Sequence, residues 1–184
     1  MKVICYGDSN TYGYDPRSWF GDRYDRPWPE LLAEKTGWNV INGGENGREV
    51  PRMPVSIPQD TDLLIVMLGT NDLLQNRSVD LIRNRMEAFL VSINVAMGKI
   101  LLLAPPPMAL GAWIENSELL RERERLAMEL CSLAERPGVL FADPGNWNIP
   151  LAYDGVHMAQ EGHRVFADRL FDYLKEKRLC WKSE

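Results

Sequence analysis

Two short stretches of this chain are apolar at nearly every position, without the alternation of apolar and polar residues that marks a half-exposed strand. Residues 62–68 read Asp-Leu-Leu-Ile-Val-Met-Leu, and residues 100–103 read Ile-Leu-Leu-Leu before three prolines end the run. Runs of this kind are typical of strands covered on both faces, as in a parallel sheet between two layers of helices. This feature restricts the fold more than any other in the sequence.

The rest of the chain supplies the other strands and helices that such a sheet needs. We expect further strands at residues 3–6, 40–41 and 139–142. We expect helices at residues 29–35, 78–97, about 117–135 and 159–175. Strands that alternate with helices predict an α/β fold with a parallel sheet. Because its 184 residues contain no internal repeat and no linker, the chain is predicted to form a single domain over residues 1–184.

Periodicity indicates how two of these helices are oriented. In the helix at 78–97, Ser78 is suited to cap the first turn, and Arg85 lies beside the apolar side rather than on it. That apolar side is formed by Ile82, Met86, Phe89 and Ile93. In the helix that Asn116 or Ser117 begins, residues 121–125 alternate in charge, which is typical of a solvated face.

Charge and cysteine content limit the partners and the compartment. The net charge is −5, the pI is about 5.2 and no run of Lys or Arg occurs, so we expect no nucleic-acid partner. No apolar run approaches the ~20 residues of a membrane span, and the first residues leave no room for a signal peptide. Cys5 and Cys131 are predicted to be small core residues, and Cys180 to be exposed near the tail. Without a CxxC pattern, neither zinc nor disulfides are predicted, which fits the cytoplasm.

Small polar residues follow four segments that end at the same edge of the predicted sheet. They are Gly-Asp-Ser-Asn at 7–10, Asn-Gly-Gly at 42–44, Gly-Thr-Asn-Asp at 69–72 and Asp-Gly-Val-His at 154–157. Any one of these segments alone is more often an ordinary turn. Four together are hard to explain in that way, because ligands bind outside the carboxyl ends of parallel strands. The sequence therefore predicts a functional site at this edge.

The residue types at this edge favour nucleophilic catalysis by a serine. Asp154 precedes His157 by three residues, so its carboxylate can hold the Nδ1–H of the imidazole within one turn of chain. Nε2 is then free to take the proton of a serine hydroxyl, for which Ser9 is the candidate. The other histidine, His163, is predicted to pack or cap. A nucleophilic serine also needs oxyanion donors, and the candidates are the backbone N–H groups of Ser9 and Gly44 and the side-chain amide of Asn71.

Other common motifs are missing. The G-x-S-x-G elbow of α/β-hydrolases does not occur, and no P-loop or G-x-G-x-x-G segment follows a strand. These absences disfavour the α/β-hydrolase fold and the usual modes of nucleotide binding.

Taken together, the four segments resemble the conserved blocks of the SGNH (GDSL-like) hydrolase family. The resemblance runs in the family's order from residue 7 to residue 163. It implies a flavodoxin-like three-layer α/β/α sandwich with five parallel strands in the order 2-1-3-4-5. It also implies a catalytic triad of Ser9, His157 and Asp154, an oxyanion hole of Ser9, Gly44 and Asn71, and no metal or other cofactor. One departure is Asn10, where the better-known motif has leucine.

The stretch at 7–14 and the prolines after residue 104 look most like the arylesterase and acyltransferase branch of the family. That branch forms oligomers through a segment that corresponds to residues 15–26, which implies that a homo-oligomer could form here. We expect a small-molecule ester as substrate, with a small acyl group such as acetyl, because the strand-end loops are short. Loop residues that could wall the cleft are Trp19, Phe20, Trp113, Trp147 and Ile149.

Three alternatives stay open at this point. One is thioesterase or lysophospholipase activity at the same site. The second is a non-catalytic ligand-binding domain of the same fold, since fold alone does not fix function. The third is a metal site built on Asp8, Asp154 and His157, which has fewer histidines than such sites commonly use.

Overall fold

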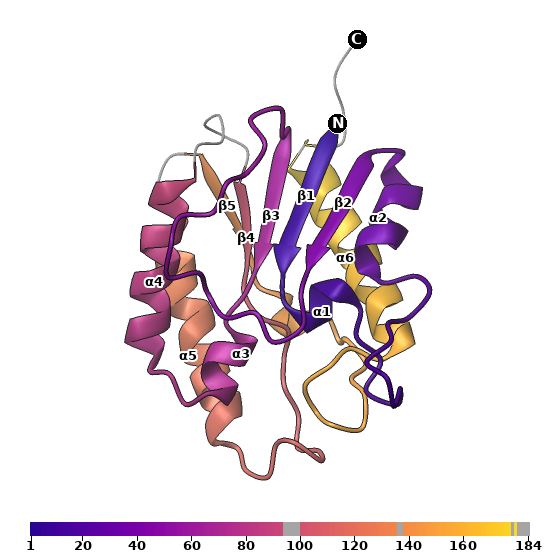
Figure 1. The fold of residues 1–184 in the computed structure, drawn as a ribbon, viewed down its shortest axis with the longest axis vertical. Coiled ribbons are helices and arrows are strands. Elements are labelled where there is room, and N and C mark those ends of the chain that lie inside the picture. Colours follow the sequence, from indigo (N-terminus) through magenta and orange to yellow (C-terminus); the bar gives the residue numbers. More distant parts are fainter. Residues whose placement is uncertain (94–99, 136–137, 178, 180–184) are drawn as a thin grey trace.

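The computed structural model describes residues 1–93, 100–135, 138–177 and 179, which form a five-stranded parallel sheet (Figure 1). The strands lie in the order β2-β1-β3-β4-β5, which confirms the predicted order. Each central strand pairs in parallel with both of its neighbours. The strands are β1 (Lys2–Gly7), β2 (Asn39–Gly44), β3 (Leu63–Met67), β4 (Ile100–Leu103) and β5 (Val139–Ala142).

Helices cover both faces of the sheet, as the uninterrupted apolar runs predicted. In Figure 1, α4 and α5 lie on one side of the sheet, and α2 and α6 lie on the other. The longer helices are α2 (Trp28–Thr36), α4 (Val79–Ser92), α5 (Glu118–Leu133) and α6 (Gln160–Glu176). Two short helices and a 3-10 turn, none of them predicted, follow strand ends: α1 (Ser9–Tyr12), α3 (Thr70–Leu74) and η1 (Pro144–Asn146).

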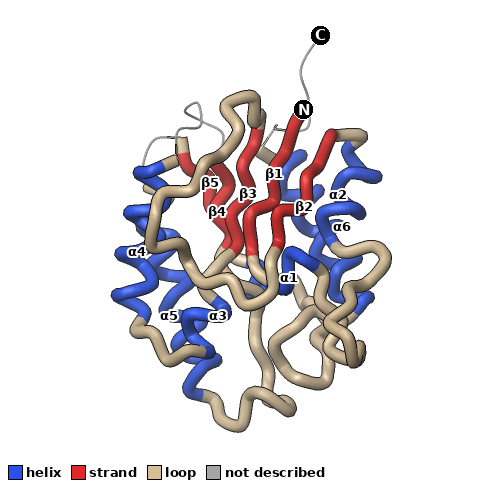
Figure 2. Tube along the Cα trace, viewed as in Figure 1, coloured by secondary structure: helices blue, strands red, loops and turns tan. Residues whose placement is uncertain are grey.

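Each central strand contributes alternate residues to two separate cores. Leu64 and Val66 of β3 pack with α4 and α5, whereas Ile65 and Met67 pack with α2 and α6. All five residues of β3 are at most 1% exposed. Burial on both faces explains why the sequence of this strand shows no alternation. Helices pack against both faces of the sheet. The loops that follow the carboxyl ends of the strands therefore start from well-packed positions at one edge (Figure 2).

The structure also tests the predicted cap and apolar side of α4 and the predicted burial of the cysteines. Ser78 caps α4 by accepting the N–H of Leu81, and the predicted apolar side of α4 is buried. The described part of α4 ends at Ser92, and residues 94–97 of the predicted helix lie outside the described residues, as does Cys180. Cys5 is buried as predicted.

Two predictions about α5 were wrong. Cys131 is exposed rather than in the core. Arg123, expected on a solvated face, is only 4% exposed, because its guanidinium donates to the carbonyl of Pro105 and pairs with Asp143. An alternating charge pattern does not reveal that one arginine turns inward to tie α5 to the ends of β4 and β5.

Among the residues that the structure describes, no helix is both long and apolar enough to cross a membrane.

Candidate active site

Ser9 is the first residue of α1, directly beyond the carboxyl end of β1. The side chain of Asp8 caps this short helix by accepting the N–H of Asn10 at 2.9 Å. Gly7 allows the sharp change of direction, because a Cβ there would lie 2.0 Å from Oγ1 of Thr11 and 2.9 Å from the carbonyl of Met67. The turn leaves Ser9 only 5% exposed. Burial also raises the pKa of Asp8 to about 6, against the lowering effect of the hydrogen bond from Asn10.

The structure joins Ser9, His157 and Asp154 in one hydrogen-bonded chain. Nδ1 of His157 lies 2.6 Å from Oδ2 of Asp154, and Nε2 lies 3.0 Å from Oγ of Ser9. A contact of 2.6 Å with a carboxylate requires a proton on Nδ1, which leaves Nε2 of the neutral ring as the acceptor for the serine hydroxyl. All three residues are at most 5% exposed. This is the geometry in which an imidazole can remove a serine proton.

Asp154 is held ionised by its neighbours. Its Oδ1 accepts the backbone N–H groups of Val156 and His157 at 2.9 and 3.0 Å, while Oδ2 faces the imidazole. Burial alone would raise the pKa of Asp154, but these hydrogen bonds outweigh burial and lower it below its ordinary range. Asp154 therefore stays a carboxylate that can stabilise a positive imidazole.

Backbone hydrogen bonds fix the loop that carries Asp154 and His157. The loop after β4 donates to it from Ala109 N to Gly155 O at 2.9 Å and from Trp113 N to Asp154 O at 3.1 Å. Gly155 has φ +77°, and a Cβ there would lie 2.1 Å from the carbonyl of Ala109, so glycine is required at this crossing. We call α1 together with residues 109–114 and 151–158 the triad side of the site.

Asn10 links the two halves of the triad side. Its Oδ1 accepts the N–H of Met158 at 2.8 Å, and its Nδ2 donates to the carbonyl of Val156 at 3.2 Å. Asn10, the residue after Ser9, thus forms hydrogen bonds to the chain on both sides of His157. Leucine, the more familiar residue here, could make neither bond. Sequence reasoning missed this role, because the unusual residue was noticed but its partners are almost 150 positions away.

Two aromatic rings flank the imidazole of His157. The ring of Tyr14 lies 4.8 Å from it between centroids, and that of Trp113 lies 5.2 Å away in an edge-on arrangement. Of the five loop residues predicted as cleft walls, Trp113 is the one whose ring contacts His157 in the described part of the chain. Trp147 packs against Phe166, and Ile149 is buried in the core. Trp19 and Phe20 are 95% and 91% exposed in the loop that follows α1.

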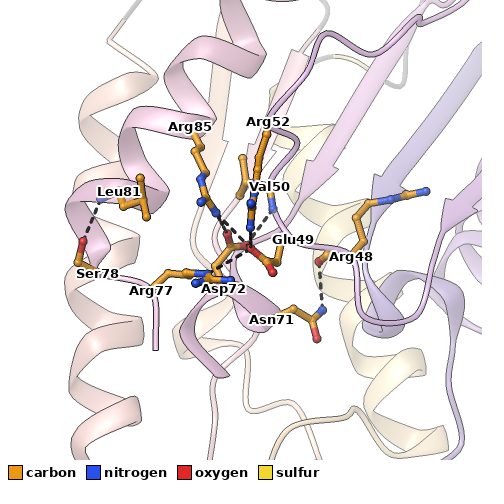
Figure 3. Close-up of polar contacts among 10 residues, drawn as sticks. All are labelled: Arg48, Glu49, Val50, Arg52, Asn71, Asp72, Arg77, Ser78, Leu81 and Arg85. Atoms are coloured by element: carbon orange, nitrogen blue, oxygen red, sulfur yellow. Dashed lines mark hydrogen bonds and ion pairs between the residues drawn. The ribbon is translucent and has the colours of Figure 1, made fainter. Parts of the chain in front are cut away.

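Asn71 lies in α3, which follows β3, and its side-chain amide is directed at Arg48 (Figure 3). Its Nδ2 donates one hydrogen to the carbonyl of Arg48 at 3.1 Å, so a second hydrogen remains for a ligand. Arg48 in turn donates to the carbonyls of Gly7 and Gly43, and its guanidinium lies 4.3 Å from the centroid of the Tyr6 ring. We call residues 45–50 together with α3 the oxyanion side.

The expectation that Gly44 supplies an oxyanion donor needs correction. Its N–H already donates to Oδ1 of Asn42 at 3.0 Å. A Cβ on Gly44 would lie 2.1 Å from the backbone nitrogen of Tyr12, so this glycine serves the packing of β2 against α1. In contrast, the N–H groups of Ser9 and Gly47 donate to no acceptor among the described residues. Gly47 also directly precedes Arg48, whose carbonyl Asn71 contacts.

The second histidine packs, as predicted. His163 is 1% exposed, and its Nδ1 faces the backbone N–H of Trp28 at 3.4 Å. Burial lowers the pKa of His163 to about 3, so it stays neutral. Among the described residues, no group of three or more His, Cys, Asp or Glu side chains could hold a metal ion.

Comparison with known proteins places this fold among solved esterase structures. The aryl esterase of M. smegmatis has 24% identity and a TM-score of 0.76, over 95% of this chain and 98% of that one. A putative arylesterase from Agrobacterium tumefaciens has 24% identity and a TM-score of 0.78, over the same shares. A carbohydrate acetylesterase family member from Sinorhizobium meliloti has 24% identity and a TM-score of 0.76, over 95% and 97%.

At this identity the structural similarity supports the fold alone. No curated protein sequence matches the chain. The sequence profile of one family, however, matches residues 5–165, which include every residue of the hydrogen-bonded chain from Ser9 to Asp154. The protein therefore belongs to the GDSL-like lipase/acylhydrolase family.

Proposed function

We propose that the protein is a serine esterase that hydrolyses esters of small acyl groups through an acyl-enzyme. The observation that carries this proposal is the hydrogen-bonded chain from Ser9 through His157 to Asp154, with distances of 3.0 and 2.6 Å. Membership in a family of lipases and acylhydrolases supports the same chemistry.

In the first half of the reaction, Oγ of Ser9 attacks the acyl carbon while its proton passes to Nε2 of His157. The carbonyl oxygen becomes an oxyanion. Its donors are the N–H of Ser9, the free hydrogen on Nδ2 of Asn71 and the N–H of Gly47, which takes the place predicted for Gly44. When the intermediate collapses, the bond from the acyl carbon to the alcohol oxygen breaks, and His157 gives its proton to that oxygen.

In the second half, water enters where the alcohol has left. His157 takes a proton from the water, and the remaining hydroxide attacks the acyl carbon. The bond to Oγ of Ser9 then breaks, and Oγ recovers the proton from His157. The acid is released and the enzyme returns to its starting state. Asp154 keeps its charge throughout, because its pKa lies below the ordinary range.

The surroundings of the triad support an ester with a small acyl group and a ring-bearing alcohol. Ser9 is 5% exposed and His157 is 4% exposed, so the chain surrounds the proposed reacting groups closely, which favours a small acyl group over a long one. The alcohol must lie next to the nitrogen that protonates it, and the rings of Tyr14 and Trp113 flank that imidazole. Aromatic faces bind flat rings and the apolar faces of sugars. The names of two similar structures, an aryl esterase and a carbohydrate acetylesterase, agree with such alcohols.

The test is hydrolysis of p-nitrophenyl esters from acetate to decanoate by the wild type and by Ser9→Ala. Ser132→Ala, which changes an exposed serine in α5, is the matched control. We expect turnover that is fastest with acetate, unchanged in Ser132→Ala and abolished in Ser9→Ala. Equal turnover in wild type and Ser9→Ala would show that the nucleophile is wrong.

Two further assays separate the alternatives. Faster turnover of acyl-CoA thioesters or lysophospholipids than of p-nitrophenyl acetate would favour thioesterase or lysophospholipase activity. A fluorophosphonate labels an activated serine whatever the substrate is. A wild-type protein that neither turns over any ester nor takes up this label at Ser9 would instead be a ligand-binding domain.

A further inference from the structure

Asp72, the neighbour of Asn71 in α3, holds the oxyanion side together from within. Its side chain is fully buried, and its Oδ2 accepts the backbone N–H of Val50 at 2.9 Å (Figure 3). Two consecutive residues of α3 therefore bind the same passing segment: Asn71 at the carbonyl of Arg48 and Asp72 at the N–H of Val50. The position of this segment relative to Asn71 depends on both bonds.

A single arginine from α4 connects the two parts of this contact. Nη1 of Arg85 lies 3.3 Å from Oδ1 of Asp72 in α3 and 3.1 Å from Oε2 of Glu49 in the passing segment (Figure 3). The Arg85 side chain is 16% exposed, so water screens these ion pairs little. The other arginines on Glu49 are more exposed, Arg77 at 36% and Arg52 at 60%.

We propose that Arg85 is a positioning residue for the oxyanion hole, which it reaches through Asp72 and Glu49. This role rests on the proposed function, because it concerns the same reaction at the same site. Among the described residues, Arg85 pairs with Glu49 and Asp72 and not with Ser9. It fixes α3, which carries Asn71, against the segment that carries the N–H of Gly47.

The charge on Arg85 matters because both of its partners are negative and close together. Burial raises the pKa of Asp72 above its ordinary value, Glu49 adds to the rise, and Arg85 acts against it. Without the arginine, the buried carboxylate of Asp72 would lack its nearest positive charge. The contact between α3 and residues 48–50 would then loosen, and the oxyanion donors would move apart. A displacement of about 1 Å in a positioning group can slow a reaction about a hundredfold.

The experiment compares Arg85→Gln and Arg85→Lys with Arg83→Gln in the same helix. Arg83 pairs with Glu87 on the partly exposed surface at 2.6 Å and is the matched control. With p-nitrophenyl acetate at 25 °C, we expect kcat of Arg85→Gln to fall about 10- to 100-fold with KM within about twofold. Arg85→Lys should fall in between, because the shorter lysine side chain keeps the positive charge but brings it less close to the two carboxylates that Nη1 of Arg85 contacts. Arg83→Gln should equal the wild type.

A second readout separates positioning from mere stability. A trifluoromethyl ketone accepts Oγ of Ser9 at its carbonyl carbon and places the resulting oxyanion in the hole, so its Ki should rise with the loss in kcat/KM. The double variant Asp72→Asn/Arg85→Gln removes both charges while the amide oxygen can still accept the N–H of Val50. It should be more active than Arg85→Gln alone, and it replaces that variant if Arg85→Gln does not fold.

The outcomes are distinct. An unchanged kcat and Ki in Arg85→Gln, even with a lower Tm, would overturn the positioning role and leave the proposed esterase intact. If only Arg85→Lys and the double variant fold, wild-type values of kcat in both would overturn it. Wild-type protein without ester turnover would overturn the proposed function, and the role of Arg85 with it.

Discussion

The triad side and the oxyanion side lie at the same edge of the sheet but are held in different ways. On the triad side, loops are joined mainly by backbone hydrogen bonds, such as those from Ala109 and Trp113 to the loop of Asp154. On the oxyanion side, ion pairs among Glu49, Asp72 and arginines hold the segments together. The arrangement of the triad side thus depends mainly on backbone hydrogen bonds, and that of the oxyanion side depends mainly on ion pairs. Three predictions test the two sides and a fourth tests the core beneath them, from the largest expected effect to the smallest.

Breaking the triad itself should have the largest effect. Asp154→Asn should lower kcat about 10⁴-fold, because the amide cannot hold Nδ1–H of His157 as the carboxylate does and the imidazole adopts the wrong tautomer. Steady-state kinetics with p-nitrophenyl acetate measure the change. Asp168→Asn, which changes a carboxylate paired with Lys35 at the surface, is the control. A loss below tenfold in Asp154→Asn would rule out the proposed role of this residue.

Removing the amide donor from the oxyanion side should have the second largest effect. Asn71→Ala should lower kcat by about 10²- to 10³-fold, with little change in KM, since the lost hydrogen bond is strongest in the transition state. Asn84→Ala, at an exposed position of α4, should behave like wild type. If KM rose instead and kcat stayed constant, Asn71 would bind the ground state and not the oxyanion.

The third prediction concerns the two hydrogen bonds that Asn10 forms with the chain around His157. Asn10→Asp keeps an acceptor for the N–H of Met158 but turns a second oxygen toward the carbonyl of Val156. We expect kcat to fall about 10- to 100-fold, because His157 moves relative to Ser9. Asn10→Leu should lose at least as much. Rates of fluorophosphonate labelling, which also depend on this alignment, should fall in step, and an unchanged labelling rate would contradict the expectation.

The smallest expected effect is on the free energy of unfolding, and not on the reaction rate. It appears when the pH is lowered from neutral to mildly acidic. Because burial lowers the pKa of His163 to about 3, the unfolded chain binds a proton there between about pH 6.5 and pH 3 that the folded chain does not. This stabilising difference is complete above pH 6.5 and is lost as the pH falls. Relative to His163→Asn, the free energy of unfolding of the wild type should fall by about 2 kcal/mol between pH 7 and pH 5.

Urea unfolding of both proteins at the two pH values measures this difference. The raised pKa of Asp8 changes stability in the opposite direction over part of this range, but it is common to both proteins and cancels. Parallel pH curves for the two proteins would mean that His163 is not a neutral buried group.

The hydrogen-bonded arrangement of Ser9, His157 and Asp154 could be predicted because its signals are local. The spacing of Asp154 and His157 implies a contact within one turn of chain, and Ser9 and Asn71 stand directly after apolar strands. The strands themselves were recognisable because burial on both faces leaves uninterrupted apolar residues. Short helices escaped prediction, since the four residues of α1 and the five of α3 have the same composition as ordinary turns.

What the sequence could not predict depends on long-range contacts of polar residues. The patterns place Arg85 beside the apolar side of its helix and Arg123 on a solvated face, but both side chains turn toward acceptors on other elements. A glycine after a strand suggests an oxyanion donor, but the N–H of Gly44 donates to Oδ1 of Asn42, two residues before it. Long charged side chains reach several ångströms from their Cα atoms, so sequence position alone does not reveal their partners.

Trp113 combines a fixed main chain with a free side chain. Its backbone N–H is bound to Asp154 O, while its indole is half exposed beside His157. Under the proposed function, a substitution at this position should therefore change which alcohol is accepted without shifting the side chains of Ser9, His157 and Asp154. Such a position is where new specificities can evolve at low cost in fitness, and where a mutant library aimed at changing the accepted alcohol would best begin.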